Sequence, residues 1–158
     1  MNSRRALDSL PHVLKWDRLC CPGELCDPGG LVVLSDEVIV CDISNHRLQC
    51  FSIEGRYTRA IGRRGVAPGC FTLPSGIATT SQLLLVAERR RVQVLTAQGV
   101  PLQVVLPDMC GSLQGITCLG SRVLVADSEA RLVHEFTVHL GKVRMLQELF
   151  ENAFKIAM

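Results

Sequence analysis

Aromatic residues and net charge are both in short supply in this sequence. Phe, Tyr and Trp make up 4% of the 158 residues, and the formal net charge is only +2. Few side chains are available to stack on nucleic acid bases, and so small a charge does not by itself indicate a nucleic acid partner. No apolar run approaches the roughly 18 residues that a membrane span requires, so we expect no membrane segment.

Secretion signals and metal-binding patterns are also missing. The basic N-terminus has no apolar stretch behind it, so we predict a cytoplasmic protein whose eight cysteines are reduced thiols. No C-x-x-C pair occurs, and no histidine stands at zinc-finger spacing from the cysteines. We therefore predict no metal site and no cofactor.

Catalytic motifs are absent as well. The sequence has no G-x-S-x-G turn, and its histidines are scattered at His12, His46, His134 and His139. Clustering of these histidines in space stays open at this point. We predict no catalytic residue and a chain that is not an enzyme.

What the sequence does have is an internal repeat. The segment Gly23–Gly30 matches Gly69–Gly76, with glycine at both ends and Pro28 aligned with Pro74. A weaker third copy places Gly115 at the last glycine. A period near forty residues, with several short strands in each unit, is typical of the blades of a β-propeller.

Short apolar runs separated by turn residues indicate the strands of each unit. No helical segment long enough for a βαβ crossover lies between them, so the fold class is all-β with antiparallel four-stranded blades. The predicted strands are Leu31–Leu34, Val38–Cys41, Leu48–Ser52, Tyr57–Ile61, Ile77–Thr80, Leu83–Ala87, Val92–Leu95, Leu102–Leu106, Ile116–Leu119, Val123–Ala126 and Leu132–Val138.

The two ends of the chain depart from the repeat. His12–Trp16 in the N-terminal segment 1–22 is a candidate outer strand of a preceding blade. An apolar stripe at helical spacing predicts an amphipathic helix over 142–158, although Lys142–Met145 stays open as a fourth strand. The stripe consists of Leu146, Leu149, Phe150, Ala153, Phe154 and Ala157.

The repeat resembles the NHL repeat of β-propellers. The resemblance is carried by Asn45-His-Arg-Leu, by Pro74-Ser-Gly-Ile-Ala and by Leu84-Leu-Val-Ala-Glu, and it covers residues 23–141 as blades near 30–75, 76–114 and 115–141. Propellers of this family typically have six blades. We therefore expect a partial propeller, completed by missing blades of a longer product, by self-association or by docking of the C-terminal helix.

An acid and an arginine recur around the turn between the second and third strands of each unit. An arginine beside a carboxylate can tie such a hairpin, and recurrence in every unit favours a structural role. The predicted structural pairs are Asp42 with Arg47, Glu88 with Arg91, and Asp127 with Arg131.

The resemblance implies a protein-binding module, as in ubiquitin ligases that recruit substrates through such a propeller. An RNA-binding surface of arginine-rich loops is the alternative, and a fragment of an axial-metal lyase or hydrolase is a weaker one, since the axial strands offer no strong metal ligand. The predicted partner contacts are loop residues: Ser44, Asn45, His46, Arg63, Arg64, Arg89, Arg90, Ser128 and Glu129.

Overall fold

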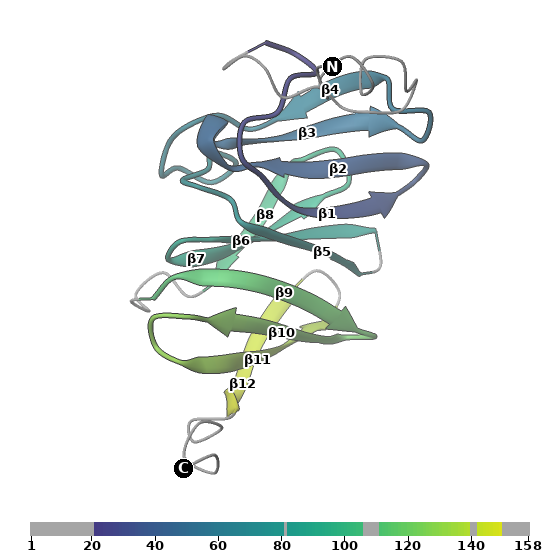
Figure 1. The fold of residues 1–158 in the computed structure, drawn as a ribbon. Helices are drawn as coiled ribbons and strands as arrows, with labels where there is room; N and C mark the ends of the chain where they lie inside the picture. Colours follow the sequence, from purple (N-terminus) through teal and green to yellow (C-terminus); the bar gives the residue numbers. More distant parts are fainter. Residues whose placement is uncertain (1–20, 81, 106–110, 140–141, 150–158) are drawn as a thin grey trace, which may run out of the picture.

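Three four-stranded antiparallel sheets make up the part of the chain that the computed structural model describes, residues 21–80, 82–105, 111–139 and 142–149 (Figure 1). We call them blades 1, 2 and 3. Within each blade the strands pair in sequence order. Blade 1 contains β1 (Pro28–Leu34), β2 (Glu37–Asp42), β3 (Arg47–Ser52) and β4 (Tyr57–Ile61), with a 3₁₀ turn, η1 (Ile43–Asn45). Blade 2 contains β5 (Gly76–Thr80), β6 (Leu83–Glu88), β7 (Arg91–Thr96) and β8 (Pro101–Val105). Blade 3 contains β9 (Leu113–Leu119), β10 (Arg122–Asp127), β11 (Leu132–His139) and β12 (Lys142–Leu149). The predicted all-β fold with antiparallel four-stranded blades is confirmed.

The blades stack one after another, with the first strand of each blade beside that of the next (Figure 1). The Gly30 amide donates to the Ser75 carbonyl at 2.9 Å, which joins blade 1 directly to blade 2. A Cβ atom at Gly30 would lie 2.9 Å from the backbone nitrogen of Ile77. The repeated glycine is therefore needed because two backbones approach each other there.

Two apolar cores fill the spaces between the blades. Strand β6 contributes to both, because Leu84 and Val86 point toward blade 1 while Leu85 and Ala87 point toward blade 3. A strand covered on both faces reads as a continuous apolar run rather than an alternating one. This explains the uninterrupted run from Leu83 to Ala87.

The predicted C-terminal helix is wrong for residues 146–149, and the alternative of a fourth strand at Lys142–Met145 is confirmed. These residues form β12, which pairs antiparallel with β11. Because the outer edge of β11 carries unpaired backbone groups, a fourth strand satisfies them as β4 and β8 do in the other blades. Residues 150–158 and the predicted strand His12–Trp16 lie outside the described residues. No helix within the described ranges has the length and apolar character to cross a membrane.

Candidate functional site

One edge of the three sheets carries the turns between second and third strands and the connectors between blades (Figure 1). We call this edge the rim and define it as residues 21–27, 43–46, 62–75, 89–90, 111–112 and 128–131. All of the predicted partner contacts lie on it. The opposite edge carries the other turns of each blade, such as Ser35–Asp36.

A buried carboxylate organises the rim of blade 1. Asp42 is fully buried, and its oxygens accept hydrogen bonds from Cys26 N at 2.6 Å and Arg47 Nε at 2.8 Å. Gln49 Nε2 donates to it at 2.9 Å, and Asn45 Nδ2 donates to both oxygens at 3.1 and 2.9 Å. A buried charge needs this many donors to offset its loss of water.

Arginine and glutamine extend the network to the segment that precedes β1. Arg47 Nη2 donates to the Cys21 carbonyl at 3.0 Å. Gln49 Nε2 donates to the Glu24 carbonyl at 2.6 Å, and Gln49 Oε1 accepts from the Gly23 amide at 2.8 Å. The network therefore fastens the incoming segment to the β2–β3 hairpin.

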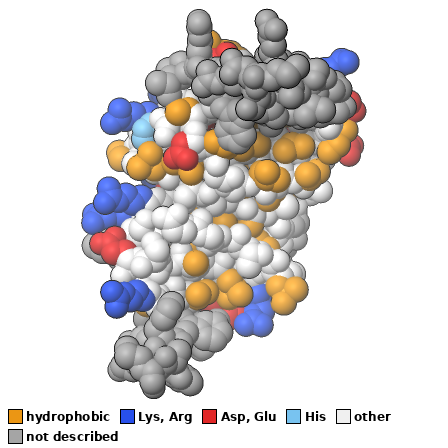
Figure 2. All heavy atoms as spheres, viewed as in Figure 1, with side chains coloured by type: hydrophobic (Ala, Val, Ile, Leu, Met, Phe, Trp, Pro, Cys, Tyr) orange, Lys and Arg blue, Asp and Glu red, His pale blue; other side chains and the backbone are white. Residues whose placement is uncertain are grey.

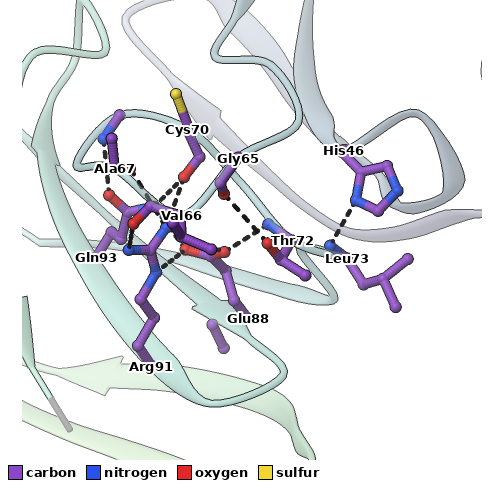
Figure 3. Close-up of polar contacts among 12 residues, drawn as sticks. His46, Gly65, Val66, Ala67, Cys70, Thr72, Leu73, Glu88, Arg91 and Gln93 are labelled. Carbon is purple, nitrogen blue, oxygen red and sulfur yellow. Dashed lines mark hydrogen bonds and ion pairs between the residues drawn. The ribbon is translucent and has the colours of Figure 1, made fainter. Parts of the chain in front are cut away.

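Blade 2 has a corresponding network around Glu88, without a counterpart of Asn45 (Figure 3). Glu88 is 1% exposed and accepts from Thr72 N at 2.6 Å, Arg91 Nε at 2.8 Å and Gln93 Nε2 at 2.5 Å. Arg91 Nη2 and Gln93 Nε2 each donate to the Cys70 carbonyl at 2.7 Å. Arg91 is therefore fully engaged within the fold, and the acid and arginine act as structure here, not as a free site.

Sequence reasoning missed the two glutamines. Gln49 and Gln93 are both fully buried, and each connects a carboxylate to the preceding connector. The sequence does contain a pattern that could have identified them. A glutamine follows the recurring arginine by two positions in both Arg47-Leu-Gln49 and Arg91-Val-Gln93.

Blade 3 departs from the predicted pair of Asp127 with Arg131. Asp127 Oδ2 lies 3.3 Å from Nε2 of the buried His134, and Arg131 is exposed in the turn. The strand register explains the difference: Asp127 pairs with Leu132, whereas Asp42 pairs with Arg47 and Glu88 with Arg91. Leu132 thus occupies in blade 3 the position that Arg47 and Arg91 occupy in blades 1 and 2.

The Asp127 carboxylate is held by other donors. Ser112 N donates to it at 3.2 Å, Glu129 N at 3.1 Å and Ala130 N at 2.9 Å. Burial by itself raises the pKa of Asp127, but the hydrogen bonds from Ala130, His134, Ser112 and Glu129 outweigh it, and the pKa lies below its usual range.

The predicted contact residues at the tip of blade 1 are partly engaged within the fold. Asn45 is bonded to Asp42, and His46 Nδ1 accepts from the Leu73 amide at 3.1 Å (Figure 3). His46 has a φ of 55°, in the left-handed region. Ser44 is exposed. Within the tip, Ser44 is therefore the residue most open to a partner.

Exposed arginines remain without a partner on the rim. Arg63, Arg64, Arg89, Arg90 and Arg131 are exposed and make no side-chain hydrogen bond or ion pair with any described residue. The exposed acids of the described rim are Asp27 and Glu129. Figure 2 shows basic side chains following one another down the left edge, where the rim lies in Figure 1. The described rim therefore presents more positive than negative charge.

A hollow lies where the rim residues of all three blades meet. Its walls come from the segment before β1, from η1, from the connector 62–75, from the β6–β7 turn and from the start of β9; they include Asp27, Ile43, Leu73, Arg89, Leu113 and Gln114. Ser75 Oγ also lines it and donates to the Leu113 carbonyl at 2.7 Å. The hollow thus combines apolar and polar side chains with the guanidinium group of Arg89.

Comparison with known proteins places these features in a family. Residues 25–51 match the model of the NHL repeat. The chain carries an NHL repeat. The matched residues run from the segment before β1 through Phe51, so the Asp42 carboxylate and its side-chain donors Arg47 and Gln49 lie within the repeat. The predicted resemblance is confirmed.

Two curated relatives are similar to parts of this chain. Protein brain tumor of Drosophila melanogaster is 26% identical over 131 residues, which is 72% of this chain and 13% of that protein. RING finger protein nhl-1 of Caenorhabditis elegans is 39% identical over 67 residues, which is 42% of this chain and 7% of that protein. The chain therefore spans a small part of the length of each relative.

Solved β-propellers share the fold of the NHL blades. A chain of the nidogen/laminin complex matches with a TM-score of 0.63 and 16% identity over 79% of this chain and 48% of its own. Virginiamycin B lyase from Staphylococcus aureus matches with a TM-score of 0.61 and 16% identity, over 76% and 41% respectively. At this identity the matches show the propeller fold alone.

Metal ligands do not gather within the described blades. Among the residues placed by the structure, no three His, Cys, Asp or Glu side chains form a group that could hold a metal ion. His46 lies in blade 1 and His134 in blade 3, where each already contacts another residue of the fold. The buried carboxylates of Asp42, Glu88 and Asp127 accept hydrogen bonds from structural donors.

Proposed function

We propose that this chain is a non-enzymatic protein-interaction module that presents its rim to a protein partner. The proposal rests on two kinds of arginine that lie side by side on the rim. Some are held by hydrogen bonds and ion pairs within the fold, and others are exposed and make no such contact with any described residue. Arg91 holds Glu88 and the connector, whereas its neighbours Arg89 and Arg90 are exposed. Because the network fastens the turn, the two free guanidinium groups are displayed from a firmly held backbone.

The name of one relative, RING finger protein nhl-1, supports a proposal about the larger system in which the chain acts. We propose a role in recruiting substrates for a ubiquitin-ligase-like system, in the cytoplasm. The cysteines support the cytoplasmic location, because cysteines usually stay reduced there and five described ones are free thiols. These are Cys26, Cys41, Cys50, Cys70 and Cys118.

RNA binding is the second candidate, and the same arginines favour it. Phosphate oxygens pair well with guanidinium groups, and the affinity would fall steeply as salt rises. The aromatic residues weigh against it. Phe51, Phe71 and Phe136 are buried, and the partly exposed Tyr57 lies beside Gly23 at one end of the rim. The rest of the described rim offers no aromatic surface on which bases could stack.

Charge reversal on the rim tests the proposal. The quadruple variant Arg63→Glu, Arg64→Glu, Arg89→Glu and Arg90→Glu should lose capture of partner proteins from cell extract. The matched control is Arg56→Glu, an exposed arginine in the β3–β4 turn at the opposite edge. Cross-linking with mass spectrometry should map captured proteins to the rim in the wild type and in the control.

Two results would reject the protein-binding role. Captured proteins that cross-link to the opposite edge, or that bind the quadruple variant as well as the wild type, contradict a rim interface. Single-stranded RNA that binds the wild type, weakens with salt and is lost in the quadruple variant, with no protein captured at the rim, would establish the RNA alternative.

A further inference from the structure

Leu73 adopts a backbone conformation that its residue type disfavours. Its φ is 53°, in the left-handed region where a Cβ atom crowds the following carbonyl group. The equivalent position of blade 1 is Asp27, with a φ of 56°, and aspartate tolerates this region better than leucine does. Blade 2 therefore holds an apolar side chain at a point where a small polar residue would suit the backbone.

The surrounding fold keeps Leu73 in place and leaves it accessible. Its amide donates to His46 Nδ1 at 3.1 Å, and Pro74 follows it directly (Figure 3). The side chain is 37% exposed and lines the hollow of the rim. Strained residues of this kind often mark binding sites, because folding alone does not favour them.

Charged side chains of both signs line the hollow. Arg89 and Asp27 line it directly, and Arg90 follows Arg89 in the same turn with its side chain exposed. The Leu113 amide donates to the Arg89 carbonyl at 3.3 Å, which fixes the backbone of this turn against blade 3. An apolar contact at Leu73 and Ile43 thus lies next to the guanidinium group of Arg89, on a rim where exposed arginines outnumber exposed acids among the described residues.

We propose that this hollow binds a short acidic segment of a partner protein. One apolar side chain of the segment would pack against Leu73 and Ile43, and neighbouring carboxylates would pair with Arg89 and Arg90. This inference rests on the proposed protein-interaction role of the rim and adds the chemistry of the partner. An acidic peptide fits better than RNA because the lining residues that the structure describes include no aromatic ring on which a base could stack.

Selection from a random-peptide display library on the full chain tests the inference. The enriched peptides should carry Asp or Glu next to a single Leu, Ile, Met or Phe. Their affinities, measured by fluorescence anisotropy, should fall about tenfold or more in Leu73→Gly and in Arg89→Glu. The variant Arg56→Glu, on the opposite edge, should bind them like the wild type.

The variants are chosen to remain folded. Glycine suits the left-handed φ of Leu73, so Leu73→Gly removes the apolar side chain without added backbone strain. Circular dichroism should show a β-spectrum like that of the wild type, and Leu73→Asn provides a second variant with the same expectation for binding.

Three results would overturn the inference. The selected peptides could show no excess of acidic residues, or they could bind Leu73→Gly and Arg89→Glu as tightly as the wild type. The third result is an oligouridylate RNA that binds the wild type more tightly than any selected peptide and does not bind the same variants. If the quadruple rim variant loses its natural partner while the selected peptides show no acidic preference, the rim function stands and the acidic segment is rejected.

Discussion

His46 Nδ1 accepts a hydrogen bond from the backbone amide of Leu73 at 3.1 Å, so a residue at the tip of blade 1 fixes the connector that enters blade 2. His46 and Leu73 both have left-handed backbones, with φ of 55° and 53°. Histidine adopts this region more readily than most residues, whereas leucine is disfavoured there. The contact therefore joins two left-handed backbone positions, and Leu73 is the strained one.

Substitutions at Leu73 should reverse the usual order of stability, so that the glycine variant is more stable than the alanine variant. Within regular structure alanine is the more stable by roughly 0.5–1 kcal/mol, because glycine loses more backbone entropy on folding. At a φ of 53° the alanine Cβ is strained. Leu73→Gly should therefore exceed Leu73→Ala in free energy of unfolding by about 1 kcal/mol in urea titrations. Equal stabilities, or a more stable alanine variant, would show that the backbone relaxes at this point.

Removal of the Asp42 carboxylate should be among the most destabilising single changes. Asp42→Ala leaves Arg47 Nε without its acceptor and removes one of the two acceptors of Gln49 Nε2. We expect a loss of about 3–5 kcal/mol in the free energy of unfolding. The double variant Asp42→Ala with Arg47→Met should lose less than the sum of the single variants, because the two residues share one network. Additive losses in denaturant titrations would contradict this coupling.

Acid should destabilise the fold partly through Asp127. Its pKa is lowered in the folded state, so its stabilising contribution is present above the unfolded pKa of about 4 and is lost as pH falls through the folded pKa. In Asp127→Asn the free energy of unfolding should therefore fall less steeply below about pH 4 than in the wild type. Glu129→Gln, whose side chain is exposed, should keep the wild-type slope.

Buried thiols should resist modification until the chain unfolds. Burial raises the pKa of Cys41 to about 12 and is the main cause that raises the pKa of Cys50 to about 11. At mildly alkaline pH both thiols stay protonated and unreactive. Iodoacetamide followed by peptide mass spectrometry should label the half-buried Cys26 and Cys70 before Cys41 and Cys50. If Cys41 in the native protein were labelled as fast as Cys26, the result would contradict the fold of blade 1.

The strands could be predicted because each blade is built from local patterns. The predicted Tyr57–Ile61 coincides with β4, and Leu48–Ser52 differs from β3 by one residue. Turn residues such as Ser35 and Asp36 supply the left-handed backbones that a tight hairpin needs, with φ of 51° and 62°. Recurrence of the same order in three units then indicated the propeller.

The errors share a physical cause, which is that pairing partners lie far away in the sequence. The apolar stripe of 142–158 has helical spacing, but the open edge of β11 recruits 142–149 as a strand. Arg131 was assigned to Asp127 from sequence distance, whereas the strand register places Leu132 opposite it. Gln49 shows the same limit, since its partners Gly23 and Glu24 belong to a segment more than twenty positions earlier.

The hollow could not be predicted from the sequence. Its lining joins residues from three blades, among them Asp27, Leu73 and Gln114. Only the closeness of β1, β5 and β9, which the repeated glycines permit, brings these residues together. The arginines were predictable as rim residues because they follow strand ends, but their position relative to Leu73 was not.

Strand β6 lies between both apolar cores, with Leu84 and Val86 on one side and Leu85 and Ala87 on the other. Blade 2 therefore cannot open without exposing both cores at once, whereas each outer blade contributes to one interface with it. Amide hydrogens of β6 should exchange only through global unfolding, and exchange should become faster toward both outer blades. The middle blade thus acts as the cooperative centre of the array, and its local opening free energy approaches that of the whole fold.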